Sequence, residues 1–349
     1  MAAPVQVSLR IPGTSPMPEL LRTIQDVESA GFDGAGILDS QLLCRDTFVT
    51  LGQAAGRTSR LTLFPAVTNP FSRHVSVLGG AIQTVAELAP GRTKVVMGTG
   101  YTSASTIGRK PATLAEMRQC ITELRKLLAG EAVDFQGTPG RLAFARGKPV
   151  SLLMAASGPK AIELAGEVAD GVMLLVGFHR GIVDAVLTHL EAGARRSGRR
   201  LEDLDIIWAV RTGIAPTMAE ARRQARPTVV HQGIMRVHSR WLGHTGLQIS
   251  HFDIPRSVYD IYPDLSHAQD WEQAIAATSF VPDEVIAELC DALGLVGTPE
   301  HCARRIIDLT CAGVRSLYVM AFQTFVGPEQ EIRTFRDEVF PRLKAAGYR

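Results

Sequence analysis

The chain has 349 residues, of which 46% are hydrophobic, and its formal net charge at pH 7 is +2. Because acidic and basic residues nearly balance, no charge excess favours nucleic acid or a membrane surface as a partner. The five cysteines are an odd number without C-x-x-C spacing, which is typical of reduced thiols. No apolar segment reaches the ~18–20 residues that span a bilayer, and residues 1–13 lack a signal-peptide pattern. We therefore expect a soluble cytoplasmic protein.

Short apolar runs alternate with longer segments of helical period along almost the whole chain. This alternation predicts an α/β fold with a parallel sheet, and eight continuous apolar runs favour closure into a (β/α)8 TIM barrel over an open sheet. We expect residues 1–349 to form a single barrel domain. The predicted strands are 5–9, 34–38, 61–67, 93–97, 150–155, 171–175, 205–210 and 316–320. The predicted helices are 17–30, 46–57, 75–89, 111–129, 158–168, 180–194, 217–226, 282–293, 299–312 and 328–345.

The long interval between the seventh and eighth strands predicts an enlarged insertion at residues 227–281. In a barrel such a segment lies over the C-terminal face, where it shapes a substrate pocket. His231, His238, His244 and His251 fall in this segment, six or seven residues apart. Helical neighbours at that spacing would be ~10 Å apart, too far to share a metal ion. We therefore predict no metal site and assign these histidines to packing and hydrogen bonding.

The segment from Ala155 to Lys160 predicts an anion site where a strand turns into a helix. Ser157 or Gly158 can cap the helix, and Pro159 suits its first turn. Lys160 is unusual there, because the positive end of the helix dipole favours an acidic residue. An anion bound to the free N–H groups would relieve the mismatch, and a phosphate of a cofactor or substrate is the expected ligand. An ordinary solvated turn is the alternative.

A second predicted helix is an internal control for this site. It opens with Gly297, Thr298 and Pro299, the same order of cap and proline, but it carries Glu300 in its first turn. That helix supplies its own negative charge, so it needs no bound anion.

The segments that follow the other strands contain few strong acids or bases. Residues 39–41, 68–74, 98–102 and 177–179 show no paired acid and base, no metal motif and no nucleophile motif. A polar but weakly ionic rim suits an enzyme whose cofactor carries the reaction. The glycines of the 98–100 segment would let a flat ring approach the backbone closely.

The predicted helix at 75–89 contains the small residues Gly79, Gly80 and Ala81. Glycine in a helix costs ~1 kcal/mol relative to alanine, so close approach of another element is expected there. The approaching element is either a helix of a second copy, which would make a homodimer, or a part of the same barrel.

With these segments together, the whole chain resembles the luciferase-like oxidoreductase superfamily, and within it the group related to methylenetetrahydromethanopterin reductase. The segments that carry the resemblance are 29–34 with Asp39, 66–74, 91–92 leading to 98–100, 107–111, and 156–160 through 169–171. The resemblance implies a barrel enzyme that uses either FMN or the deazaflavin coenzyme F420.

The resemblance also implies where the coenzyme binds. Relatives that use the deazaflavin hold its ring against a bulge of the third strand with a non-proline cis peptide, which by motif position is Ala66–Val67 here. Thr68, Asn69, Gly98, Thr99 and Gly100 are then expected to line the ring or its ribityl side. The phosphate is expected at Ala155, Ala156, Ser157, Gly158, Pro159 and Lys160.

Three residues are the candidate catalytic groups: Asp39, Ser40 and Tyr101. Several deazaflavin enzymes have histidine where this chain has Ser40 and an acidic residue where it has Tyr101. Both differences remove a group that transfers protons readily near neutral pH, and a tyrosine with a reference pKa near ~10 is a weak donor. For Asp39, a structural cap of its loop is the alternative.

The sequence thus predicts an F420-dependent oxidoreductase that transfers a hydride between C5 of the coenzyme and a carbon of an unsaturated or oxidised small organic substrate, bound under residues 227–281. One alternative is a two-component FMN-dependent monooxygenase, which needs oxygen and a partner reductase. Another is a cofactor-free barrel lyase or isomerase that acts on a phosphorylated metabolite. A non-enzymatic role is the fourth, which the presence of both the 66–74 and 155–160 segments disfavours.

Overall fold

The computed structural model describes residues 4–145, 150–235, 239–262 and 264–349. The chain divides into two compact units. The N-terminal unit consists of residues 8–174 and 189–206, and the C-terminal unit consists of residues 1–7, 175–188 and 207–349.

The strands form a closed parallel (β/α)8 barrel with one additional strand, as expected. Their order is β10-β9-β11-β1-β2-β3-β4-β7-β8, and a further pairing between β9 and β8 closes it. The barrel strands are β1 (Gln6–Ile11), β2 (Gly34–Ile37), β3 (Thr62–Thr68), β4 (Lys94–Met97), β7 (Ser151–Ala156), β8 (Gly171–Leu174), β9 (Asp205–Ile214) and β11 (Ser316–Ala321). All eight predicted strands are therefore confirmed.

Three short strands were not predicted from the sequence. β5 (Val133–Phe135) and β6 (Thr138–Gly140) form an antiparallel hairpin, and β10 (Gly294–Gly297) pairs with the end of β9 from Arg211 to Ile214. The sequence Gly-Leu-Val-Gly is too short to show a periodicity, so only pairing with β9 defines β10 as a strand.

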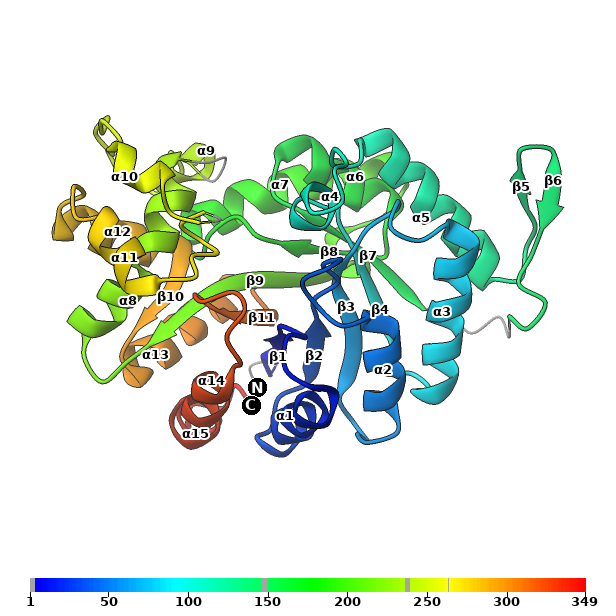
Figure 1. Cartoon of the computed structure of the whole chain (residues 1–349), viewed down its shortest axis with the longest axis horizontal. Helices are drawn as coiled ribbons and strands as arrows, with labels where there is room; N and C mark the ends of the chain where they lie inside the picture. The colour runs from blue at the N-terminus through cyan, green and yellow to red at the C-terminus, as the bar shows by residue number, and fades with distance from the viewer. Residues whose placement is uncertain (1–3, 146–149, 236–238, 263) are drawn as a thin grey trace. The chain divides into compact units, whose positions relative to one another are not determined.

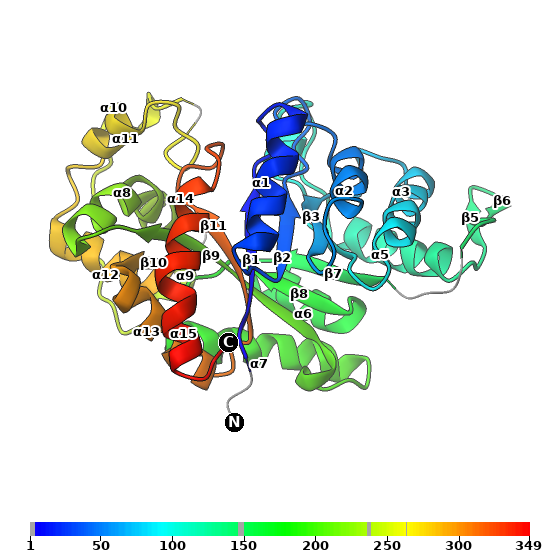
Figure 2. The same ribbon diagram turned by 90° about the horizontal axis from the view of Figure 1, so that it is seen from below.

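In the N-terminal unit, helices cover the outer side of the strands, and α2, α3 and α5 lie side by side (Figures 1 and 2). The helices of this unit are α1 (Met17–Ser29), α2 (Thr47–Ala55), α3 (Val75–Leu88), α4 (Thr102–Ser105), α5 (Leu114–Leu128) and α6 (Pro159–Val168), and α7 (Arg180–Arg196) ends in it. Local caps set two of these starts. The carboxylate of Asp46 accepts the Val49 N–H at α2, and Thr113 forms a capping box with Glu116 at α5.

Helix α6 is held in place by a close contact with α7. A Cβ atom added at Gly193 would lie 1.9 Å from the Glu163 carbonyl oxygen, and one added at Gly166 would lie 2.4 Å from the Leu190 carbonyl oxygen. Only glycine fits at both positions, so the two backbones lie in direct contact. The N-terminus of α6, where an anion is expected, is thereby fixed on the unit.

The glycines of α3 face their own chain. A Cβ atom at Gly79 would lie 3.5 Å from Leu127 of α5 and 3.5 Å from Leu142, and one at Gly80 would lie 3.8 Å from Phe144. These distances are ordinary van der Waals contacts, so packing within the chain does not by itself require glycine at either position.

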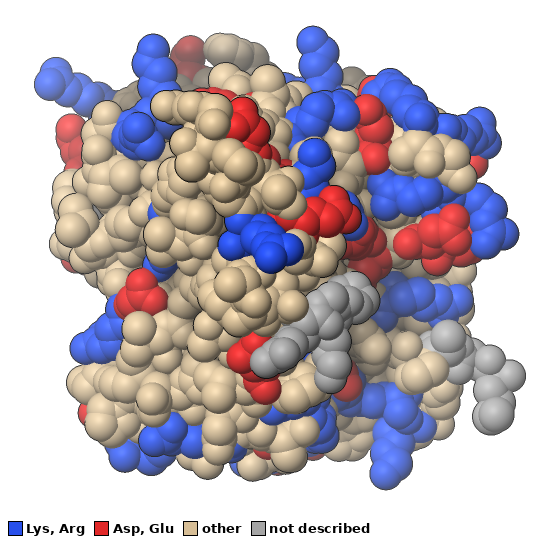
Figure 3. All heavy atoms as spheres, turned by 90° about the vertical axis from the view of Figure 1, so that its right-hand side faces the viewer, with Lys and Arg blue, Asp and Glu red and all other residues tan. Residues whose placement is uncertain are grey.

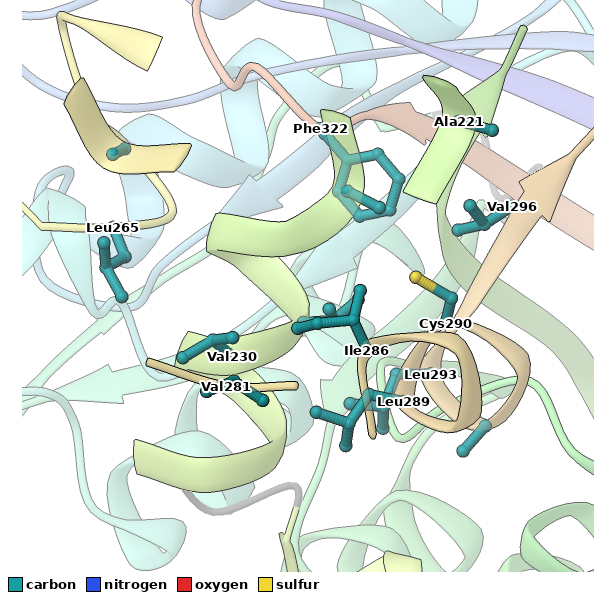
Figure 4. Packing of buried hydrophobic residues seen from close by; sticks show 14 of the residues in the cluster. Ala221, Val230, Leu265, Val281, Ile286, Leu289, Cys290, Leu293, Val296 and Phe322 are labelled. Atoms are coloured by element: carbon teal, nitrogen blue, oxygen red, sulfur yellow. The ribbon is translucent and has the colours of Figure 1, made fainter. Parts of the chain in front are cut away.

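The C-terminal unit has its own hydrophobic core, to which the 227–281 insertion contributes. Figure 4 shows α8 side chains such as Val230 packed against Ile286 and Leu289 of α12, near Phe322. The insertion adds Val258, Ile261, Leu265, Trp271 and Ala274 to this cluster. The helices of the unit are α8 (Met218–Val230), α9 (Ser239–Leu242), α10 (Arg256–Tyr259), α11 (Trp271–Ala277), α12 (Asp283–Leu293), α13 (Pro299–Cys311), α14 (Glu329–Thr334) and α15 (Phe340–Ala345). A role of the insertion in shaping a substrate pocket stays a prediction.

Two predicted helix ends differ from the structure. Helix α8 continues through Pro227 to Val230 before a π-helical turn, η2 (His231–Met235), because burial of Val229 and Val230 outweighs the lost backbone hydrogen bond. The single helix expected at 328–345 contains a second π-helical turn, η3 (Phe335–Val339), between α14 and α15. Pro341 lacks the N–H that would continue a regular α-helix there.

In the described part of the chain, no helix is long and apolar enough to cross a membrane.

Candidate active site

The predicted site residues of the N-terminal unit meet at the carboxyl ends of β2, β3, β4 and β7. The Ala66–Val67 peptide bond is cis, as the resemblance implied, and the register between β3 and β4 shifts between Ala66 and Thr68. The Gly98 N–H donates to the Thr68 carbonyl oxygen at 2.8 Å, which joins the ends of the two strands.

Asn69 organises the segment that follows β3. Its Oδ1 accepts the backbone N–H groups of Phe71 and Ser72 at 3.2 and 2.8 Å, and its Nδ2 donates to Ser103 Oγ of α4 at 3.2 Å. Asn69 is fully buried. The side chain therefore shapes the loop of its own strand and connects it to the loop after β4.

The glycines after β4 are closely surrounded by the chain's own side chains. A Cβ atom at Gly98 would lie 3.0 Å from Val67 Cγ2 and 3.5 Å from Ala155 Cβ. Gly100 has φ +78°, and a Cβ atom there would lie 2.7 Å from the Phe71 ring. Protein atoms fill the space where a side chain would lie at both glycines, and close approach of a ring to this backbone stays a prediction. Val67, Gly98 and Ala155 are brought into direct contact.

A buried polar atom at this position fits a bound cofactor. The Thr68 side chain is fully buried, and its Oγ1 has no hydrogen-bond partner among the described residues. A buried hydroxyl without a partner costs free energy, on the order of 1–3 kcal/mol. A ligand with a polar ring edge or a hydroxylated side chain would supply the missing partner. The residues at the ends of β3 and β4 therefore fit a cofactor of the flavin or deazaflavin type.

Asp39 is held by a buried ion pair that sequence reasoning did not find. Arg73, from the loop after β3, places Nη1 2.7 Å from Asp39 Oδ2 and Nη2 2.7 Å from Asp46 Oδ2. The exposed fractions are 15% for Arg73, 4% for Asp39 and 49% for Asp46. One guanidinium thus bridges the end of β2 and the start of α2.

The charges of this triad shift two pKa values. Burial alone would lower the pKa of the Arg73 guanidinium, but the charge of Asp39 and the hydrogen bonds to both carboxylates outweigh it and raise the pKa. Burial alone would raise the pKa of Asp46, but the Val49 N–H and the Arg73 guanidinium lower it. Both groups are therefore held in their charged forms.

Gln41 completes the surroundings of Asp39. Its Nε2 donates to Asp39 Oδ1 at 3.0 Å, while its Oε1 is buried without a hydrogen-bond partner among the described residues. Both oxygens of Asp39 are thereby engaged, one by Arg73 and one by Gln41. This arrangement supports the structural alternative for Asp39, since a proton donor or acceptor needs a free oxygen.

The other two candidate catalytic residues lie on either side of this network. Ser40 is half-buried directly after Asp39, and its carbonyl oxygen accepts the N–H groups of Leu43 and Cys44 at 3.2 and 3.0 Å. Tyr101 precedes α4 and is 56% exposed. Tyr101 is therefore open to a ligand from the surface.

The N-terminus of α6 differs from that of α13 as the sequence predicted. Thr298 caps α13 by accepting the His301 N–H at 3.3 Å, and Glu300 lies in the first turn. At α6 the cap is Gly158, which has no side chain to accept a hydrogen bond, and the first turn carries the exposed Lys160. Ala155 lies at the end of β7, in contact with the position of Gly98, so this terminus adjoins the β3 and β4 ends.

The sequence contains a partial signal for Arg73. It is the one arginine in the segment after β3, and because β2 and β3 are parallel neighbours, with Ile37 opposite Pro65, the loops after them start side by side. Asp39 and Asp46 both follow β2, however, so the sequence does not show which carboxylate is the buried partner. For Gln41 the sequence contains no such signal.

Comparison with known proteins identifies the family of this chain. The family model for luciferase-like monooxygenases matches residues 1–316. The chain belongs to this family.

Within the described part of the chain, no group of three or more His, Cys, Asp or Glu side chains is arranged to hold a metal ion.

Relatives of this chain include named F420-dependent enzymes. It is 28% identical over 316 residues to the 5,10-methylenetetrahydromethanopterin reductase of Methanolobus tindarius, covering 87% of this chain and 89% of that protein. It is 34% identical over 222 residues to the F420-dependent glucose-6-phosphate dehydrogenase of Beutenbergia cavernae, covering 57% of this chain and 65% of that protein. The structure of the coenzyme F420-dependent tetrahydromethanopterin reductase of Methanopyrus kandleri matches with a TM-score of 0.78 at 20% identity, covering 97% of this chain and 99% of that one.

We expect Arg73→Met to destabilise the protein by about 3–5 kcal/mol, because it leaves the Asp39 carboxylate buried without its partner. The matched control is Arg118→Met, which removes an ion pair with Glu167 whose arginine is 47% exposed and should cost less than about 1 kcal/mol. Urea denaturation at pH 7 measures both values. Equal losses for the two variants would contradict a buried pair, and Asp39→Asn added to Arg73→Met should recover much of the loss.

The stabilisation by the ion pair of Arg73 with Asp46 should be lost at low pH. Because the pKa of Asp46 is lowered on folding, its ion pair stabilises the protein above the ordinary carboxylate value of about 3.9. That stabilisation is lost as the pH falls through the lowered pKa. The difference in stability between the wild type and Asp46→Asn should therefore shrink below pH ~4.

Proposed function

We propose that this protein is an F420-dependent oxidoreductase that transfers a hydride between the coenzyme and a carbon of an unsaturated or oxidised small organic substrate. The observation that supports it best is the convergence of the β3, β4 and β7 ends with the α6 N-terminus in one compact unit. A ring site and a phosphate site thus adjoin each other. The deazaflavin is favoured over FMN by the names of two relatives that specify F420, the glucose-6-phosphate dehydrogenase of Beutenbergia cavernae and the reductase of Methanopyrus kandleri.

When bound, F420 supplies the hydride at C5 of its ring. The chain's own residues would bind and orient it: Thr68 and Asn69 at the ring or ribityl side, and the backbone N–H groups at the start of α6, with Lys160, at the phosphate. Ser40 and Tyr101 are the groups proposed to donate a proton to the substrate. The pairing of Asp39 with Arg73 assigns it the role of holding the loop that carries Ser40.

Cofactor binding and oxygen dependence separate this proposal from a monooxygenase. We expect oxidised F420 to bind with micromolar affinity, and reduced F420 to support substrate reduction under strict anaerobiosis, because the reduced deazaflavin is a hydride donor that reacts poorly with oxygen. Titration of the same apo preparation with F420 and with FMN measures the preference. Copurification with FMN, or turnover only with oxygen and a flavin reductase, would contradict the F420 assignment and support the FMN-dependent monooxygenase.

The phosphate site can be tested against the matched helix in the same chain. We expect Ser157→Ala combined with Lys160→Glu to weaken F420 binding roughly ten- to a hundredfold, since a charge-assisted contact is worth about 1.5–3 kcal/mol. Thr298→Ala combined with Glu300→Lys is the control, because α13 is capped by its own side chain. Equal, small effects at the two helices would mean that residues 155–160 form an ordinary turn.

We also propose that two copies associate through α2 and α3. Val49, Val77 and Leu88 are 59%, 59% and 53% exposed on these adjacent helices, and α3 carries a single charged residue, Glu87. Figure 3 shows the side of the molecule on which α3 and α5 lie, where a broad area has neither acidic nor basic side chains. Exposed apolar side chains such as Val49, Val77 and Leu88 on adjacent helices are typical of a contact between subunits.

Light scattering at micromolar concentration decides the oligomeric state. We expect a dimer, and we expect replacement of Gly80 by a bulky residue such as Gln to shift the equilibrium toward monomer, because Gly80 is partly exposed on α3. A monomeric wild type, or a dimer that Gly80→Gln leaves intact, would rule out this interface.

A further inference from the structure

The turn between β2 and α2 is fixed in place at both of its sides. The Cys44 thiol donates to the Pro12 carbonyl oxygen at 2.9 Å, and the Arg45 N–H donates to the Gly13 carbonyl oxygen at 3.1 Å. The Thr47 hydroxyl donates to the Leu38 carbonyl oxygen at 2.6 Å. Together with the bridge from Arg73 to Asp39 and Asp46, these bonds leave the turn little freedom to rearrange.

This rigid turn presents a leucine to solvent in an unfavourable backbone conformation. Leu42 has φ +69°, a left-handed backbone conformation that residues other than glycine rarely adopt. Its side chain is 84% exposed. Leu43 beside it is 41% exposed. Neither burial nor backbone preference explains a leucine at position 42. Strained positions of this kind cluster at ligand-binding sites, where the strain serves the function.

The neighbouring residue presents a fixed hydrogen-bond acceptor. Asp39 Oδ1 can only accept a hydrogen bond, so the Gln41 amide must direct its Nε2 toward Asp39 and its Oε1 away from it. That Oε1 is buried and lacks a partner among the described residues. A buried acceptor that the ion-paired carboxylate holds in one orientation suits a donor group of a ligand.

We propose that Gln41 and Leu42 determine which substrate binds, and that the substrate carries a hydroxyl or N–H donor beside an aliphatic part. The donor hydrogen-bonds to Gln41 Oε1, and the aliphatic part packs on Leu42. This inference rests on the proposed function, because the substrate meant is the hydride donor or acceptor for F420. Ser40, a proposed proton donor, immediately precedes both residues, so recognition and proton transfer share one turn.

The first test uses a series of secondary alcohols from 2-propanol to 2-octanol as probes, titrated against the protein with and without F420. If the alkyl chain of the alcohol packs on Leu42, affinity should rise about fourfold per added methylene, which corresponds to about 0.8 kcal/mol for burying one such group. In Leu42→Gly this gain should largely disappear. The same variant should have a higher melting temperature than the wild type, because glycine suits the left-handed conformation.

The second test uses Gln41→Met with 2-hexanol and its methyl ether, which lacks the donor. The wild type should bind the alcohol at least tenfold more tightly than the ether, and Gln41→Met should bind the two about equally. The preference for the alcohol, rather than overall affinity, is the informative quantity, since a general loss of structure would weaken both ligands.

The control is Gln136→Gly in the β5–β6 hairpin, where the wild-type φ is +55°. It should raise the melting temperature without changing the binding of any alcohol. Alcohol binding that is absent, or that is independent of chain length in the wild type, overturns the inference even when F420 binds. So does a change of oligomeric state in Leu42→Gly, which would assign Leu42 to a contact with a second copy. Failure of F420 itself to bind counts instead against the proposed function.

Discussion

The candidate site depends on one guanidinium. Arg73 leaves the loop after β3 and binds a carboxylate at the end of β2 and another at the start of α2. Because Asp39 is almost fully buried, its charge is tolerated only while Arg73 and Gln41 satisfy it. The position of the turn that carries Ser40, Gln41 and Leu42 is therefore coupled to the loop that follows β3.

Close packing defines the rest of the site. Val67 and Ala155 occupy the space beside Gly98, and the Phe71 ring occupies the space beside Gly100. Asn69 then uses all of its polar atoms to hold the adjoining loops. Among the described residues, the buried side-chain atoms of this region without a hydrogen-bond partner are Thr68 Oγ1, Ser72 Oγ and Gln41 Oε1. Because burial without a partner is unfavourable, these atoms fit contacts with the ligand that we propose there.

The N-termini of α6 and α13 share a local sequence pattern but differ in how they are capped. Both helices begin with a cap followed by proline, but Thr298 satisfies α13 from within while Gly158 leaves α6 without a side-chain cap. The direct backbone contact of α6 with α7 at Gly166 and Gly193 keeps that open terminus fixed. A rigid helix without a side-chain cap from Gly158 and with Lys160 in its first turn fits the anion that we propose there, whereas α13 carries Glu300 in its own first turn.

The sequence alone determined the eight barrel strands, the helix starts at Asp46 and Thr298, and the difference between α6 and α13, because each depends on residues close together in the chain. Its resemblance to a family also located the cis bond at Ala66–Val67. The tertiary structure decided what depends on contacts between distant segments: the strand at Gly294–Gly297, the reason for Gly98 and Gly100, and the pairing of Asp39 with Arg73. A strand of four residues has no periodicity of its own, a glycine does not reveal which neighbour it admits, and an acid does not reveal its partner. Those properties arise only when β2, β3, β4 and β7 lie side by side.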